Sequence, residues 1–150
     1  IGFMDRIGIA PYVDVKHRAE VIALWREAFG YEASHNKPDL VIDQKIGFGD
    51  GLFFVALADN VVVGTVMAGF DGHRGWIYSV AVASAHRRNG VGSRLVRFAE
   101  SELATRGCMK VNLQIVEGNT NATAFYAALG FAVERRVSMG KQIPANIPPL

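Results

Sequence analysis

The chain has 150 residues, half of them hydrophobic, with 16 lysines and arginines against 14 aspartates and glutamates. This profile predicts a single domain with a hydrophobic core over residues 1–150, of which residues 1–3, before Met4, are interpreted as an expression remnant. The net charge of +2 is too small for nucleic-acid binding through a basic surface, and no apolar run reaches the roughly 20 residues that span a bilayer, so neither partner is expected.

The first predicted elements are a short strand near residues 7–12 and a helix over residues 14–29. Asp14 is a suitable N-cap for this helix, and Gly30 is typical of a helix end. A proline at the start of residues 38–46 favours a second short helix there.

Three strands in a meander are predicted next. Residues 52–58 and 61–70 are rich in β-branched and aromatic residues. Asp59-Asn60 joins them, and this pair tolerates the positive φ angles of a two-residue hairpin turn. A second turn at residues 71–75 leads into a strand over residues 76–83. These strands are therefore expected to be antiparallel.

The pattern changes to a helical period over residues 90–106, which Gly107 ends. The next strand is predicted over residues 111–116, and the passage from strand through helix to strand is a crossover that makes the sheet mixed. A last helix is expected over residues 119–130, and residues 131–139 are predicted to return as a strand.

This order of elements describes an α+β domain with an antiparallel meander and one β-α-β crossover. Residues 142–150 hold three of the five prolines and are expected to form a tail. The single cysteine, Cys108, has no disulfide partner in the chain, which favours a reducing, cytoplasmic setting. The histidines show no ligand spacing, so no metal is expected.

The stretch HRRNGVGSRL at residues 86–95 lies at a junction of strand and helix. Free N–H groups and the positive dipole end of a helix favour phosphate oxygens, and Arg87 and Arg88 add charged donors. No Lys-Ser/Thr pair follows Gly92, so this is not a P-loop, and Leu95 stands where a dinucleotide fingerprint requires a glycine. A capped helix with a solvated basic loop is the alternative interpretation.

Arg87, Gly90 and Gly92 form an Arg-x-x-Gly-x-Gly motif between a meander strand and a helix. Together with Asn119 and the run YAALGF at residues 126–131, in this order and with the expected crossover between them, the motif resembles the GNAT N-acetyltransferases over nearly the whole domain. Within that family the chain looks like the small bacterial YpeA-like proteins, a similarity that names no substrate.

The resemblance implies acetyl-CoA as the acyl donor and direct acetyl transfer to an amine. It implies that main-chain groups of Val80 and Val82 pair with the pantetheine arm and that Asn119 and Tyr126 also lie at the cofactor. The diphosphate is expected on the loop formed by Arg87, Arg88, Asn89, Gly90, Val91, Gly92 and Ser93.

Tyr126 matches the family's general acid, which protonates the CoA thiolate as it leaves, and a packed tyrosine is the alternative interpretation. Many relatives carry a glutamate where this chain has Gln114, and an amide cannot accept the amine's proton. Glu117, His73, Asp71 and an ordered water chain are the candidate bases.

Trp25, Tyr31 and Phe48 lie where the family forms its acceptor pocket, although such aromatic residues are equally explained as core. The acceptor could be a small molecule or a protein amine, and a homodimer is open. Because Gln114 replaces the usual glutamate, a non-catalytic acyl-CoA-binding module is the alternative function.

Overall fold

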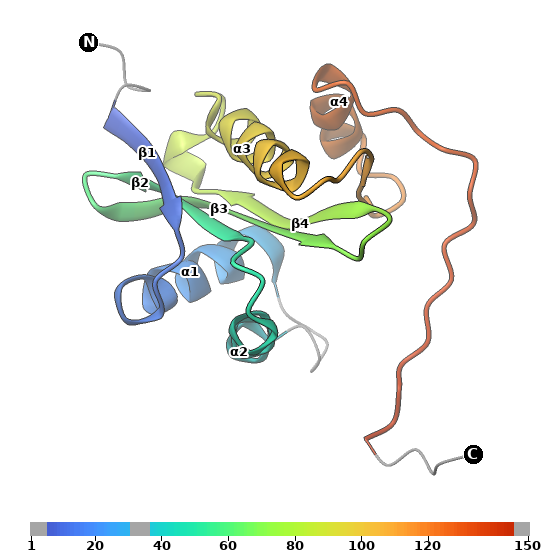
Figure 1. The fold of residues 1–150 in the computed structure, drawn as a ribbon. Helices are drawn as coiled ribbons and strands as arrows, with labels where there is room; N and C mark the ends of the chain where they lie inside the picture. Colours follow the sequence, from blue (N-terminus) through green and yellow to red (C-terminus); the bar gives the residue numbers. More distant parts are fainter. Residues whose placement is uncertain (1–5, 31–36, 146–150) are drawn as a thin grey trace. The chain divides into compact units, whose positions relative to one another are not determined.

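A computed structural model describes residues 6–30 and 37–145 of the chain (Figure 1). The chain divides into two compact units, Ile1–Gln114 and Ile115–Leu150, and each is described by itself. The expectation of one domain over residues 1–150 stays a prediction.

The first unit contains a five-stranded sheet in the order β1-β2-β3-β4-β5. Four strands pair antiparallel in sequence order and the fifth pairs parallel with β4: β1 (Ile7–Pro11), β2 (Phe53–Ala58), β3 (Val61–Phe70), β4 (Gly75–Val82) and β5 (Val111–Asn112). Its helical elements are α1 (Asp14–Phe29), α2 (Pro38–Phe48), the 3-10 turn η3 (Ser84–His86) and α3 (Val91–Thr105).

Helices cover both faces of this sheet, with α1 and α2 on one side and α3 on the other (Figure 1). On the first side, Trp25 of α1 and Ile42 of α2 are buried in one cluster with Met67 of β3. On the second side, α3 buries an apolar stripe that includes Leu95 and Leu103. A sheet covered on both faces requires apolar residues at successive positions, which explains the continuous hydrophobic runs of β2 and β3.

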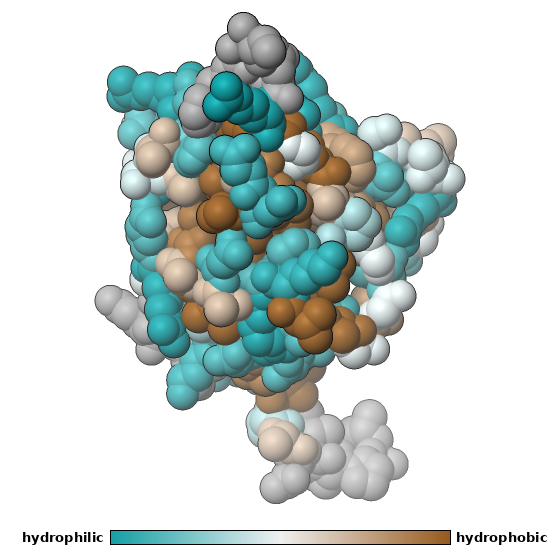
Figure 2. All heavy atoms as spheres, turned by 90° about the vertical axis from the view of Figure 1, so that its left-hand side faces the viewer, coloured by the Kyte–Doolittle hydropathy of each residue, from teal (hydrophilic) through white to brown (hydrophobic). Residues whose placement is uncertain are grey.

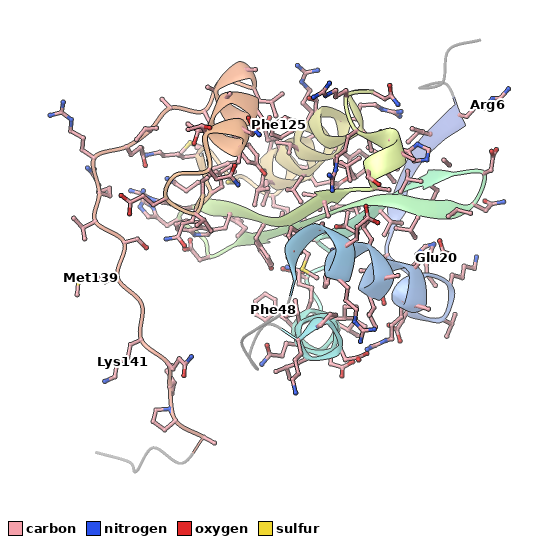
Figure 3. All side chains as sticks on the ribbon, turned by 180° about the vertical axis from the view of Figure 1, so that it is seen from behind. Arg6, Glu20, Phe48, Phe125, Met139 and Lys141 are labelled. Atoms are coloured by element: carbon pink, nitrogen blue, oxygen red, sulfur yellow. The ribbon has the colours of Figure 1, made fainter. Side chains whose placement is uncertain are left out.

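The second unit contains α4 (Thr120–Ala128), and from there to residue 145 the chain has neither helix nor strand. Met139 and Lys141 lie along this extended segment in Figure 3. Val133, Val137 and Met139 are 84%, 90% and 91% exposed, so the alternating apolar residues of this segment cover no core.

The predicted α+β class and mixed sheet are confirmed, as is the hairpin turn, in which Asp59 and Asn60 have φ angles of 49° and 64°. The strand predicted over residues 131–139 is wrong, because no neighbouring strand pairs with this segment in the described part of the chain. The strand predicted over residues 111–116 is limited to Val111–Asn112. The helix predicted over residues 38–46 continues to Phe48.

The prediction of Asp14 as the N-cap of α1 is also wrong, because Val13 holds that position. The Asp14 carboxylate instead accepts hydrogen bonds from the Tyr12 hydroxyl at 2.7 Å and from Arg18 Nε at 2.8 Å. The main-chain N–H of Val13 donates to Nδ1 of His17 at 2.9 Å, so a buried histidine side chain supplies the acceptor for this N–H group at the start of the helix.

No helix within the described ranges is long and apolar enough to cross a membrane. On the face of the molecule shown in Figure 2, hydrophilic side chains surround smaller hydrophobic patches.

We expect His17 to make folding sensitive to mild acid. Its burial lowers the pKa of the imidazole, and protonation of Nδ1 would remove the acceptor of the Val13 N–H. Below about pH 6.5, the unfolded chain binds a proton that the folded chain excludes, so the free energy of unfolding should fall as pH decreases further. Urea unfolding at a series of pH values measures this fall, which should be smaller in His17→Gln.

His73→Gln is the matched control, because His73 is exposed in the turn between β3 and β4. That variant should keep the wild-type pH dependence. An unchanged pH dependence in His17→Gln would show that His17 is not the group responsible.

Candidate cofactor-binding site

The Arg-x-x-Gly-x-Gly motif forms the connection from β4 to α3. After the η3 turn the chain passes through two left-handed residues, Arg88 with φ 67° and Gly90 with φ 76°. Glycine adopts this conformation freely, whereas it costs a residue such as arginine about 1 kcal/mol. Gly90 is the N-cap of α3, so the motif places the start of this helix at the end of the loop.

The first turn of α3 offers its N–H groups to a ligand. Gly90 has no side chain to cap the helix, and the first turn contains no acidic residue. The first main-chain bond in the helix is donated by Arg94 to the Gly90 carbonyl at 3.1 Å, so the N–H groups of the residues before Arg94 lack helical acceptors. By contrast, α1 and α2 carry an aspartate in the first turn and α4 has a side-chain cap. Among the helices that the structure describes, α3 is thus the one best prepared for an anion.

Arg87 connects this loop to β4. Its Nε donates to the main-chain carbonyl of Val82 at 3.1 Å, which positions the guanidinium group at the end of the strand. The two Nη groups can still form charge-assisted hydrogen bonds. The structure therefore brings together the predicted diphosphate loop and Val82, one of the two residues predicted to pair with the pantetheine arm.

The strand β4 contains a β-bulge beside Val80. In the register with β3, Ala81 lies opposite Thr65 and Tyr78 lies opposite Met67, so β4 has one residue more than β3 in this interval. Ser79 in the bulge has a φ angle of 52°. A bulge interrupts the regular ladder and re-aims main-chain groups, which makes this part of β4 suitable for binding a ligand through its backbone.

Gly64 of β3 lets α3 approach the sheet closely. It lies opposite Val82, and a Cβ atom at this position would be 2.8 Å from Leu95 Cδ1 and 3.1 Å from the Ala81 carbonyl oxygen. The sequence analysis missed this residue, although a glycine inside a β-branched strand signals a close approach. It also missed Thr65, which is the subject of the inference below.

A cavity of about 250 Å³ lies between α2 and the sheet. Lys45 is nearly buried there and donates to Asp50 Oδ2 at 2.9 Å, to the Tyr78 hydroxyl at 2.8 Å and to the Ala68 carbonyl. The single charges of Lys45 and Asp50 therefore neutralise each other. The cavity is lined by Val41, Gln44, Lys45, Phe48, Asp50, Met67, Gly69 and Tyr78.

Of the three aromatic residues expected at the acceptor pocket, one lines the cavity, one is buried in the core and one lies outside the described residues. Phe48, labelled in Figure 3, extends from α2 and lines this cavity while remaining 73% exposed. Trp25 is 1% exposed and belongs to the core. Tyr31 lies outside the described residues.

In the second unit, Asn119 caps α4 by accepting the Ala122 N–H at 3.1 Å. The ring of Tyr126 packs edge-on against Phe125 and Phe131, with centroids 4.9 Å and 5.7 Å away. Burial raises the pKa of the Tyr126 hydroxyl to about 12. This group therefore carries its proton at neutral pH, as a proton donor must.

The candidate bases differ in their surroundings. The carboxylate of Asp71 accepts the N–H groups of Arg74 and His73 at 2.7 and 2.8 Å, and these bonds lower its pKa, so it stabilises the turn and is a poor proton acceptor. His73 is exposed in the same turn, and Glu117 is exposed in the second unit. In the described ranges, no group of three or more histidine, cysteine or acidic side chains could hold a metal ion.

Residues 18–131 of the chain match the acetyltransferase (GNAT) family. This range includes the bulged strand, the loop and α4.

Three solved structures show the same fold. An aminoglycoside N-acetyltransferase, AAC(6')-Iy, in complex with CoA is 21% identical, with a TM-score of 0.74 over 91% of this chain and 94% of that one. A glucosamine-6-phosphate N-acetyltransferase from Arabidopsis thaliana is 20% identical, with a TM-score of 0.69 over 92% and 99%. A transcriptional regulator from Bacillus halodurans C-125 is 22% identical, with a TM-score of 0.72 over 91% and 99%.

We expect Gly64→Ala to destabilise the first unit. The added methyl group would contact Leu95 and the Ala81 main chain at distances that force α3 away from the sheet. Overpacking of this kind costs about 1–3 kcal/mol, measurable as a decrease in the free energy of unfolding in urea.

Gly8→Ala in β1 is the matched control, because nothing lies within 4 Å of the Cβ position there. This variant should be close to wild type in stability. Equal stability of the two variants would mean that α3 does not depend on the small residue at position 64.

Proposed function

Because the chain belongs to the GNAT acetyltransferase family, we propose that it transfers the acetyl group of acetyl-CoA directly to an amine. The observation that carries this proposal is the uncapped N-terminus of α3, which follows the arginine-containing loop at the end of the bulged strand β4. An anion-binding helix end and an interrupted strand together suit a cofactor that has a diphosphate at one end and an amide-containing arm at the other.

In this proposal the diphosphate binds the N–H groups of residues 88–93, with Arg87 and Arg88 supplying charge-assisted donors. Gly90 lacks a side chain that would obstruct the phosphates. The arm lies along β4, where main-chain groups of Val80 and Val82 bind it. Arg87 contacts the Val82 carbonyl, so one side chain connects the two parts of the site.

The chemistry requires two proton transfers and one site for negative charge. The amine nitrogen attacks the thioester carbonyl carbon, and the Val80 N–H stabilises the resulting oxyanion. The C–S bond then breaks, and Tyr126 gives its proton to the departing CoA thiolate. The proton that the amine loses goes to a base, and Tyr126 is reprotonated from solvent.

Glu117 and His73 are the proposed bases. An ordered water chain is the alternative, which would carry the proton of the amine to solvent without either side chain. Gln114 cannot accept a proton, and the carboxylate of Asp71 is held by main-chain N–H groups. The roles of Asn119 at the cofactor and of Tyr126 as the acid remain proposals, because they combine residues of the two units.

The acceptor is proposed to enter at the cavity beside Tyr78. Aminoglycosides carry several positive charges, and glucosamine-6-phosphate carries a phosphate. In the described lining of this cavity the charges of Lys45 and Asp50 are paired with each other. The lining therefore favours an amine attached to a neutral or apolar group.

The YpeA-like subgroup, a cytoplasmic setting and a homodimer also stay predictions.

Gly90→Asp tests the cofactor site. A carboxylate at the start of α3 would repel the diphosphate, so we expect CoA to bind about a hundredfold more weakly than to the wild type, as measured by calorimetry. The wild type should also release CoA thiol from acetyl-CoA in the presence of a panel of amines. Binding without thiol release would instead fit the non-catalytic acyl-CoA-binding module.

Gly72→Asp is the control for this experiment. Gly72 also has a positive φ angle, 90°, but it lies in the turn before β4, at the opposite end of the strand from the loop. It should bind CoA as the wild type does. Full CoA affinity in folded Gly90→Asp would remove the loop from the cofactor site.

Tyr126→Phe tests the general acid. The variant keeps the ring that packs against Phe125 and Phe131 and removes only the proton donor. General acids contribute about 100-fold or more, so kcat should fall by at least that factor while the Kd for CoA stays within about threefold. Tyr12→Phe removes a hydroxyl group from the first unit and should leave kcat unchanged. An unaltered kcat in Tyr126→Phe would exclude the proposed role.

A further inference from the structure

A buried threonine connects the core to the bulge of β4. Thr65 of β3 is completely buried, and its hydroxyl carries two hydrogen bonds. Trp25 Nε1 of α1 donates to Thr65 Oγ1 at 2.8 Å, and Thr65 Oγ1 donates to the main-chain carbonyl of Ser79 at 2.9 Å. All three residues belong to the first unit, so this chain of contacts extends from the core helix to the bulge.

The direction of these bonds is fixed by chemistry. An indole N–H can only donate, and a hydroxyl has one hydrogen to give. Since Thr65 accepts from Trp25, its own hydrogen is available for the Ser79 carbonyl. Without the hydroxyl, a buried donor on Trp25 and a carbonyl in the bulge would both lose their partner, which costs more than the loss of an exposed bond.

The Ser79 carbonyl determines where the next N–H group points. The peptide between Ser79 and Val80 is planar and trans, so its C=O and N–H groups point in opposite directions. Because the C=O group is held toward the Thr65 side chain, the Val80 N–H must point away from it. Ser79 has a φ angle of 52°, a conformation that an L-residue rarely adopts without support from its surroundings.

A purely apolar core would not need this hydroxyl. The other residues of β3 that are buried include Val63, Val66 and Met67, and valine has nearly the shape of threonine. Thr65 is the polar exception: it pairs with Ala81 next to the bulge, and its hydroxyl reaches the carbonyl of Ser79 in the bulge.

We propose that Thr65, held by Trp25, is a positioning residue that aims the Val80 N–H at the thioester carbonyl oxygen of acetyl-CoA. This inference rests on the proposed function, because it assigns the oxyanion donor of that reaction. According to this inference, kcat depends on the orientation of the Ser79–Val80 peptide group, which the buried side chains of Thr65 and Trp25 determine.

Thr65→Val tests this role, because it removes the hydroxyl and keeps the volume. We expect kcat to fall about tenfold to a hundredfold, somewhat less than the loss of an oxyanion donor itself, while the Kd for CoA changes by less than about threefold. The Val80 N–H bond should change its orientation, measured by NMR as its one-bond residual dipolar coupling in the absence of substrate. Thr65→Ser keeps the hydroxyl and should recover most of kcat and the wild-type coupling of the Val80 N–H.

Ile42→Val is the control for lost stability. Ile42 of α2 is buried in the same core cluster as Trp25 and belongs to neither β3 nor β4. It should lower the free energy of unfolding, yet leave kcat and the Val80 amide unchanged at temperatures where the variant is folded.

The outcomes separate this inference from the proposed function. An active wild type with equal kcat in Thr65→Val and Thr65→Ser, or with the same loss in Ile42→Val, would overturn the positioning role. A wild type that binds CoA but releases no thiol would overturn the proposed function. In that case an unchanged Val80 coupling in Thr65→Val overturns the inference as well, and a changed coupling that Thr65→Ser restores supports the positioning of the amide.

Discussion

The approach of α3 to the sheet at Gly64 is the constraint on which the site depends. Gly64 lies opposite Val82, the last residue of β4, and the side chains that crowd its Cα, Val91 and Leu95, come from the first turns of α3. Close packing at this one point therefore puts the end of the bulged strand and the N-terminus of the helix next to each other. The loop between them has only to turn the chain, which the left-handed Arg88 and Gly90 do.

Charge is distributed so that the loop stays positive although the net charge is only +2. Two cations elsewhere in the first unit are paired with carboxylates: Arg18 contacts three aspartates of α1 and α2, and Lys45 contacts Asp50. In the described part of the chain, neither Arg87 nor Arg88 forms an ion pair with a carboxylate. Their charge adds to the positive end of the helix dipole of α3. The electrostatic potential at the loop is therefore more positive than the net charge of +2 alone would indicate.

The sequence was sufficient where structure is determined by neighbours along the chain. The Asp59-Asn60 hairpin, the apolar stripe of α3 and the loop motif depend on local turn chemistry and periodicity. The alternating residues 131–139 suggested a strand, but a strand also requires a partner that periodicity cannot supply. Asp14 failed as a cap because Tyr12 and Arg18 compete for its carboxylate. The contacts from Trp25 to Thr65 and from Thr65 to Ser79 join residues 40 and 14 positions apart, which no local pattern encodes.

In the proposed reaction, Gln114 stands where many relatives carry a glutamate, which would shift the demands of catalysis toward positioning. An amine with a pKa of about 10 is mostly protonated at neutral pH, and a general base can contribute about 10²–10⁴ in rate by removing that proton. A fixed oxyanion donor contributes about 10²–10³ and needs no titrating group. Thr65 and Trp25 are buried in the core and hold the Ser79 carbonyl, and we propose that they thereby orient the Val80 N–H as this donor. In the proposed reaction, precise orientation of one peptide group would therefore offset much of what a missing carboxylate would have supplied, while Glu117, His73 or a water chain takes the proton.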